Sequence, residues 1–327
     1  MTKQINRAGL VPALLLSALP LPSQAEPSLA LPIDCIPGET CYIQNYMDRD
    51  PGPGARDYTC AGLSYDGHKG TDFALPSLTA MIDGVEVRAA AAGTVRGVRD
   101  GMIDRFYTPA EDERIDGRDC GNGVVLDHGD GWESQYCHMR QGSLRVSSGQ
   151  RVEAGTPLGL VGLSGRSQFP HLHISLRHKG QPVDPFTPRA DATTCGTGDG
   201  ATLWADVLPY QPGAVLSAGF ATEVPEYDAV KAGTAAALEI PRDAPALILW
   251  GFAFGGQTGD RMTLIVDGPE GRVFDADPVL EKDQAMFFRA GGKRLRTPLT
   301  AGLYSGTVLL TRDGREISRK TVEIDIR

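Results

Sequence analysis

Glycine and proline interrupt this sequence so often that we expect short strands rather than long helices. The chain of 327 residues contains 40 Gly and 23 Pro, and the glycines follow no Gly-x-y period. Because both residues end regular elements and form turns, this spacing predicts a mostly β protein with many tight turns. The length also exceeds what one compact core usually holds, so we expect about two domains.

The composition is that of a soluble globular protein. Hydrophobic residues make up 41% and charged residues 22% of the chain, which excludes a disordered protein. The 32 basic and 41 acidic residues give a net charge of −9. An excess of negative charge argues against a nucleic-acid partner.

The first 25 residues have the layout of a secretory signal peptide. Two basic residues, Lys3 and Arg7, precede an apolar run over residues 8–22, and small residues follow at 23 and 25. A membrane anchor is the alternative, but the run is short, contains two prolines and lacks basic residues after it. We therefore predict a signal peptide over residues 1–25, a periplasmic or secreted protein, and no stable membrane span after its removal.

Six cysteines agree with an exported protein, because an even number in an oxidising compartment predicts disulfides. No CxxC pair is present, which disfavours a cysteine zinc knuckle. Only five residues separate Cys35 from Cys41, so we expect these two to pair. The sequence does not determine the other pairs; Cys60–Cys120 and Cys137–Cys195 are working guesses.

Strand-like runs fall into two groups, which predict two domains over residues 56–195 and 213–327. Residues 26–55 are rich in proline and glycine and are predicted as an N-terminal extension, and residues 196–212 as a linker. In the first group the expected strands are Glu86–Ala92, Thr94–Val98, Gly123–Asp127, Glu133–His138 and Leu172–Arg177. In the second group they are Ala246–Phe254, Arg261–Asp267, Ala285–Arg289, Gly302–Thr311 and Glu316–Ile326.

The charged segment in the first group and the fold of the second group lead to two further expectations. Residues 99–119 are highly charged and have no strand pattern, which is typical of a functional or mobile loop. The second group, with turns such as Asp313-Gly314, predicts a small antiparallel β-sandwich of immunoglobulin-like type. It contains neither His nor Cys, so metal or thiol chemistry is not expected there.

The segment HLHISL at residues 171–176 alternates strictly between polar and apolar side chains. On a strand, His171, His173 and Ser175 therefore share one face, and the apolar residues lie on the other. Imidazole is a common zinc ligand, and two imidazoles at i and i+2 can converge on one site. Two solvated histidines on a half-buried strand are the alternative interpretation.

Two other segments carry candidate ligands. His68 and Asp72 flank Gly70, which allows the tight path that would bring an imidazole and a carboxylate to one point. A surface histidine and a turn aspartate are the alternative. His138 ends a predicted strand, where a partly buried structural histidine is also common.

Together these segments are more specific than each alone. HxxxD at 68–72, YxH at 136–138, GLSG at 162–165 and PHLH at 170–173 follow in this order. This arrangement resembles the lysostaphin/LytM-type zinc endopeptidases of bacterial cell walls. The resemblance covers about residues 64–186, including GQRVEAGTPLGLVGLSG at 149–165 and VDPF at 183–186.

The resemblance implies a LytM-type antiparallel β-sheet domain and a zinc-dependent peptide hydrolase. By that resemblance His68, Asp72 and His173 bind one Zn²⁺ per chain, and His138 and His171 form the catalytic pair. It further implies peptidoglycan stem peptides as substrate, in the manner of a DD-endopeptidase. Three protein ligands leave a position for water, as in catalytic zinc sites, whose metal lowers the pKa of water and polarises a carbonyl. Which histidine acts as general base stays open.

Three other interpretations compete. The first is a non-enzymatic LytM-like factor that binds and regulates wall hydrolases or division proteins; the presence of all five site residues argues against it. The second is a binding module in which the metal is structural and the C-terminal β-sandwich binds a periplasmic protein. The third is a serine nucleophile at Ser164, but the GxSxG pattern is absent. His128 and His178 are expected to be structural or solvated.

Overall fold

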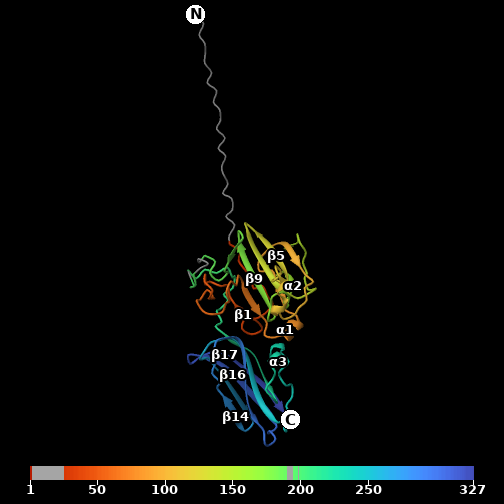
Figure 1. The fold of residues 1–327 in the computed structure, drawn as a ribbon, viewed down its shortest axis with the longest axis vertical. Helices are drawn as coiled ribbons and strands as arrows, with labels where there is room; N and C mark the ends of the chain where they lie inside the picture. Colours follow the sequence, from red (N-terminus) through yellow and green to blue (C-terminus); the bar gives the residue numbers. More distant parts are fainter. Residues whose placement is uncertain (2–25, 190–193, 198) are drawn as a thin grey trace.

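The computed structural model describes residues 1, 26–189, 194–197 and 199–327 (Figure 1). The predicted signal peptide, residues 1–25, lies outside the described residues apart from Met1. The described part is mostly β, as expected, and its helices span at most six residues. None of the described helices is long and apolar enough to cross a membrane. The helices are α1 (Leu78–Asp83), the 3-10 turn η1 (Pro109–Glu111), α2 (Asp112–Ile115) and α3 (Tyr227–Ala232).

An antiparallel sheet of eight strands dominates the first domain. Its order is β1-β2-β9-β6-β5-β4-β7, and β10 pairs with the end of β9. Two further strands, β3 (Glu86–Arg88) and β8 (Pro157–Leu160), form a separate pair. The strands of the large sheet are β1 (Tyr42–Asn45), β2 (Thr71–Ala74), β4 (Gly93–Arg99), β5 (Asn122–Gly129), β6 (Trp132–Met139), β7 (Arg151–Val152), β9 (His171–His178) and β10 (Gln181–Val183).

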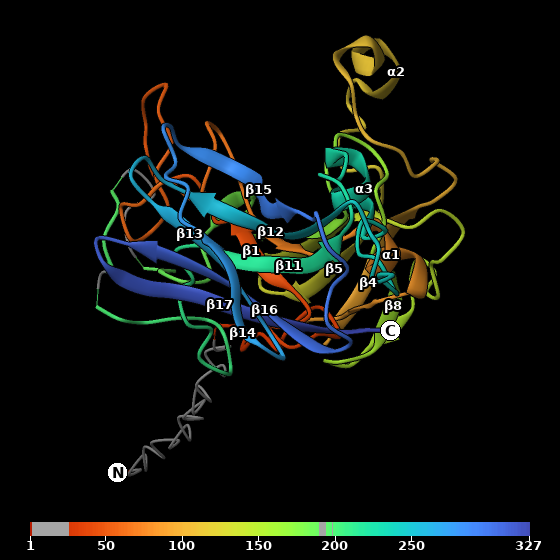
Figure 2. The ribbon, with the colours of Figure 1, turned by 90° about the horizontal axis from the view of Figure 1, so that it is seen from below.

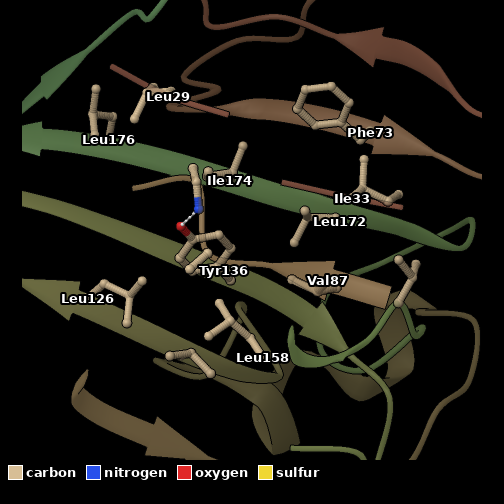
Figure 3. Packing of buried hydrophobic residues seen from close by; sticks show 14 of the residues in the cluster. Leu29, Ile33, Phe73, Val87, Leu126, Tyr136, Leu158, Leu172, Ile174 and Leu176 are labelled. Carbon is tan, nitrogen blue, oxygen red and sulfur yellow. Dashed lines mark hydrogen bonds between the residues drawn. The ribbon is translucent and has the colours of Figure 1, made fainter. Parts of the chain in front are cut away.

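Strand β9 lies between β2 and β6 and carries the alternation predicted from its sequence. Leu172, Ile174 and Leu176 are each at most 4% exposed and pack into the main core. Figure 3 shows them beside Phe73, and it shows the Tyr136 hydroxyl accepting a hydrogen bond from a backbone N–H, that of Ala90. The opposite face of β9 is thereby left to the polar side chains.

The predicted N-terminal extension and linker both contribute to this domain. Residues 42–45 of the extension form the edge strand β1, which pairs with β2. In the linker, Leu203 and Trp204 are buried in the main core, and Trp204 pairs with Leu29. Apolar side chains in two segments rich in glycine and proline therefore extend the core beyond the strands expected from the sequence.

The C-terminal domain consists of two antiparallel sheets that enclose a second core. All five strands expected here are present, together with β11 and β14, which the sequence did not indicate. The immunoglobulin-like description of this domain remains a prediction. One sheet has the order β11-β12-β15 and the other β14-β13-β16-β17. Their bounds are β11 (Ala214–Ala221), β12 (Ala246–Gly256), β13 (Arg261–Gly268), β14 (Gly271–Ala276), β15 (Gln284–Arg294), β16 (Gly302–Arg312) and β17 (Arg315–Ile326).

The two domains meet through apolar side chains. The Tyr42 ring of β1 stacks on Phe254 of β12 with centroids 4.4 Å apart. Ala74 of β2 belongs to the same buried cluster, and α1 contacts α3 at this junction (Figure 1). The cluster therefore joins the C-terminal domain to the end of β2.

The charged segment 99–119 forms no strand beyond the end of β4 at Arg99. It contains η1 and α2, and Figure 2 shows α2 standing out from the rest of the molecule. Near the end of this segment, Asp119 forms an ion pair with Arg166, whose guanidinium lies over the Tyr107 ring. These contacts fix the segment against the loop that precedes β9.

All six cysteines form disulfides, and one of the three predicted pairs is correct. Cys35 pairs with Cys41 as expected. The other two predicted pairs are wrong, because the structure pairs Cys60 with Cys195 and Cys120 with Cys137. The β5–β6 hairpin brings the last two together, since Asn122 lies opposite Met139 in its register.

Candidate metal centre and active site

Strand pairing brings three candidate ligands to one point. In the β2–β9 register Asp72 lies directly opposite His173. Its Oδ1 atom is 2.8 Å from His173 Nδ1 and 3.1 Å from His68 Nε2, and these two nitrogens are 3.1 Å apart. Gly70 keeps the connecting loop close, because a Cβ there would lie 2.7 Å from the His173 ring.

This donor set fits zinc. Two imidazole nitrogens and one carboxylate oxygen are ordinary zinc ligands, and tetrahedral ligands at about 2.0 Å from the metal lie roughly 3.3 Å from one another. The three distances of 2.8–3.1 Å are close to that spacing. The His68 and Asp72 side chains are almost fully buried, and that of His173 is 16% exposed, so the site opens on one side.

Hydrogen bonds to neighbouring groups orient two of the candidate ligands, His68 and Asp72. His68 Nδ1 donates to the carbonyl oxygen of Tyr46 at 2.7 Å, which leaves Nε2 with its lone pair toward the site. Asn45 Nδ2 donates to the second oxygen of Asp72 at 3.0 Å. Such partners fix the orientation of metal ligands and increase affinity. Burial raises the pKa of Asp72, but the adjacent His68 and His171 outweigh it, so the carboxyl pKa lies well below its usual range.

The other two histidines stand beside this centre. The His138 and His171 rings have centroids 4.5 Å apart, and His138 is 6.0 Å from the His173 ring. His171 Nε2 is 3.7 Å from Asp72 Oδ1. His138 has a left-handed backbone with φ of 61°, which its N–H bond to the Cys120 carbonyl helps to hold.

Both of these histidines are set up as neutral bases. Each Nδ1 atom donates to a backbone carbonyl at 2.8 Å, that of Ser164 for His138 and that of Phe169 for His171. Burial lowers the pKa of His138 well below the ordinary value, and the neighbouring histidines add to this shift. Burial also lowers the pKa of His171, although the Asp72 carboxylate opposes the shift. Both rings are therefore neutral near pH 7, with Nε2 able to accept a proton.

The remaining candidates have structural contacts. The Ser164 hydroxyl donates to the Met139 carbonyl at 2.7 Å and accepts the Asn122 N–H at 2.9 Å, so it is fully used within the fold. His128 bonds to the Ala92 carbonyl and to the Ser134 hydroxyl. His178 stacks on Trp132 with centroids 4.3 Å apart.

A cleft of about 280 Å³ opens over the exposed side of the centre. His138 and His173 lie in its wall, beside both cysteines of the Cys120–Cys137 disulfide. Basic side chains at Lys69, Arg166 and Arg177 line it as well. A peptide in this cleft would meet His138 and His173 in the wall, with His68 and Asp72 buried behind them.

Asn45 is the site residue that the sequence did not indicate. It lies in a segment predicted as an extension, and no local motif marks an amide that reaches a carboxylate 27 residues away. Its signal lies only in the pairing of β1 with β2, where Asn45 lies opposite Asp72.

We predict that Asn45→Ala lowers zinc affinity by about 10- to 100-fold, the usual effect of losing a group that orients a ligand. Competition with a chromophoric chelator measures this change. Gln141→Ala, which removes an exposed amide elsewhere, serves as the control and is expected to keep the affinity of the parent protein. Equal affinity in the two variants would show that Asn45 does not orient Asp72.

A protein-family model matches the segment that contains this site. Residues 66–185 match the model described as Peptidase family M23. The chain carries an M23 peptidase domain. All five site residues lie inside the matched segment. The resemblance stated from the sequence motifs is thereby confirmed.

Individual relatives match only part of this chain. The peptidoglycan DD-endopeptidase ShyA of Vibrio cholerae is 33% identical over 117 residues, which are 36% of this chain and 22% of ShyA. The murein hydrolase activator EnvC of Escherichia coli is 44% identical over 62 residues, 19% of this chain and 14% of EnvC. The chain therefore spans less than a quarter of the length of these relatives.

Solved structures that are similar to part of this chain include the catalytic domain of the prophage-encoded M23 protein EnpA from Enterococcus faecalis. It is 27% identical, with a TM-score of 0.31, over 45% of this chain and 92% of that domain.

Proposed function

We propose that this protein is an exported zinc metallo-endopeptidase that hydrolyses peptide cross-links of bacterial peptidoglycan. One observation carries the proposal: three convergent candidate ligand atoms lie beside two neutral histidines, and His138 and His173 of this group line a cleft of the M23 domain. A binding protein has no need for two proton-accepting groups beside an accessible metal site. We assign His68, Asp72 and His173 as the ligands and His138 and His171 as the catalytic pair.

The residues divide the chemistry between them. Zinc, when bound, supplies a Lewis acid that polarises the peptide carbonyl and makes water more acidic. The Nε2 atom of one catalytic histidine takes a proton from the attacking water, because burial keeps that ring neutral. The protonated ring then gives this proton to the leaving amine, directly or through the Nε2 atom of the other ring, so the proton is conserved. The carbonyls of Ser164 and Phe169 hold the two rings in orientation throughout.

Export and substrate follow from independent features. The predicted signal peptide directs the chain out of the cytoplasm, and three disulfides are typical of an oxidising compartment. ShyA, which shares the M23 domain, is named as a peptidoglycan DD-endopeptidase. A peptidoglycan substrate therefore suits both the location and the relatives.

A regulatory, non-enzymatic role is the alternative, because EnvC, named as a murein hydrolase activator, also shares part of the domain. The complete set of five site residues favours the enzyme. The two functions differ in what the purified protein does alone. An endopeptidase loaded with zinc releases soluble peptides from purified sacculi, and chelation stops the release. A regulator releases none without a partner hydrolase.

A further inference from the structure

The polar face of β9 continues beyond the proposed active site. His171, His173, Ser175 and Arg177 alternate along the strand and so share one face. Arg177 lines the same cleft as His173 and His138. Arg177 is the fourth residue after His173, so their Cα atoms lie about 13 Å apart along the strand. The guanidinium itself reaches back to Gln135, which lies opposite Ser175, so it stands nearer to the proposed metal than the Arg177 Cα does.

Arg177 has no acidic partner among the described residues. Its guanidinium donates to the Gln135 side-chain carbonyl, a neutral group. The residue opposite Arg177 on β6 is Glu133, but Glu133 forms an ion pair with Arg96 instead. The Gln135 bond uses one donor and leaves the others of the guanidinium available to a ligand.

A second cation reinforces this charge. Lys69 lines the cleft and forms no hydrogen bond or ion pair with the residues that the structure describes. Arg166 differs, because Asp112 and Asp119 neutralise it. Asp119 is the only acidic group in the cleft wall among the described residues. The cleft is thus locally positive in a chain whose net charge is −9.

We propose that Arg177, together with Lys69, binds a free carboxylate of the peptide substrate within about four residues of the scissile bond. This limit follows because the guanidinium lies nearer to His173 than the Arg177 Cα does, and an extended peptide advances about 3.3–3.6 Å per residue. Arginine matches a carboxylate with two parallel N–H bonds, which gives both affinity and register. This proposal rests on the proposed endopeptidase function and adds its substrate class: acidic peptides, cleaved better than their amidated forms.

The test uses one cross-linked stem peptide in three forms: with free carboxylates, with carboxamides only at the side-chain carboxyls, and with carboxamides only at the C termini. The full-length, zinc-loaded protein is expected to lose about 10- to 100-fold in kcat/KM on one amidated form, since hydrogen bonds to charged groups are worth that much. The form that loses activity identifies which carboxylate is bound.

Two variants separate this inference from the proposed function. Arg177→Gln is expected to cleave all three peptides at about the same reduced rate, mainly through a higher KM, while its zinc content is unchanged. Arg151→Gln, an exposed arginine on β7 at the far edge of the sheet, removes the same charge and is expected to keep the preference. If the parent protein cleaves all three forms equally, the inference is wrong and the endopeptidase survives. If it cleaves none, the proposed function itself fails.

Discussion

Replacing His173 with alanine is expected to abolish both zinc binding and peptide hydrolysis. His173 is one of only three proposed ligands, and its Nδ1 lies 2.8 Å from Asp72 and 3.1 Å from His68. Two remaining ligands do not hold zinc firmly, so the metal is lost on purification. His68→Ala is expected to behave in the same way. Elemental analysis and a peptide hydrolysis assay on the same samples measure both effects.

A matched control lies on the same strand. His178 stacks on Trp132 outside the metal centre, so His178→Ala is expected to keep about one zinc per chain and its activity. Retention of a full zinc equivalent at unchanged affinity in His173→Ala would remove His173 from the ligand set.

The second large effect separates catalysis from metal binding. His138→Ala and His171→Ala leave all three ligands in place, so zinc is expected to remain at about one per chain. Hydrolysis is expected to fall by about 100- to 10,000-fold, the usual contribution of general acid–base catalysis. The loss should appear in kcat, because each ring is proposed to transfer protons rather than to bind the substrate.

Zinc content again decides the interpretation. If His138→Ala lost zinc as readily as His173→Ala, the centre would have four protein ligands and no open position. Such a closed centre is typical of structural zinc and would favour a binding module over an enzyme.

Local pattern predicted most of what positions the site. The period-2 alternation of residues 171–176 placed His171 and His173 on one face and the apolar residues in the core, and β9 has this arrangement. The strands predicted at Gly123–Asp127 and Glu133–His138 are present as β5 and β6. These elements depend on neighbouring residues, so a single sequence contains the information.

Contacts between residues far apart in the sequence could not be predicted from local patterns. Asn45 reaches Asp72 only because β1 joins the sheet, and no residue near Asn45 indicates that partner. Cys60 and Cys195 are 135 residues apart, so their pairing depends on the whole fold. The Cys120–Cys137 disulfide depends instead on a local pairing, because the antiparallel strands β5 and β6 place these two segments opposite each other.

The most direct test of the endopeptidase is the digestion of defined cross-linked muropeptide dimers by the purified, zinc-loaded protein, followed by mass analysis. Hydrolysis of a cross-link converts the dimer into two monomers whose summed mass exceeds that of the dimer by one water. We expect these monomers with the parent protein and none after chelation, with activity restored by added zinc. Dimers that stay intact with a protein shown to hold one zinc per chain would contradict the proposed function.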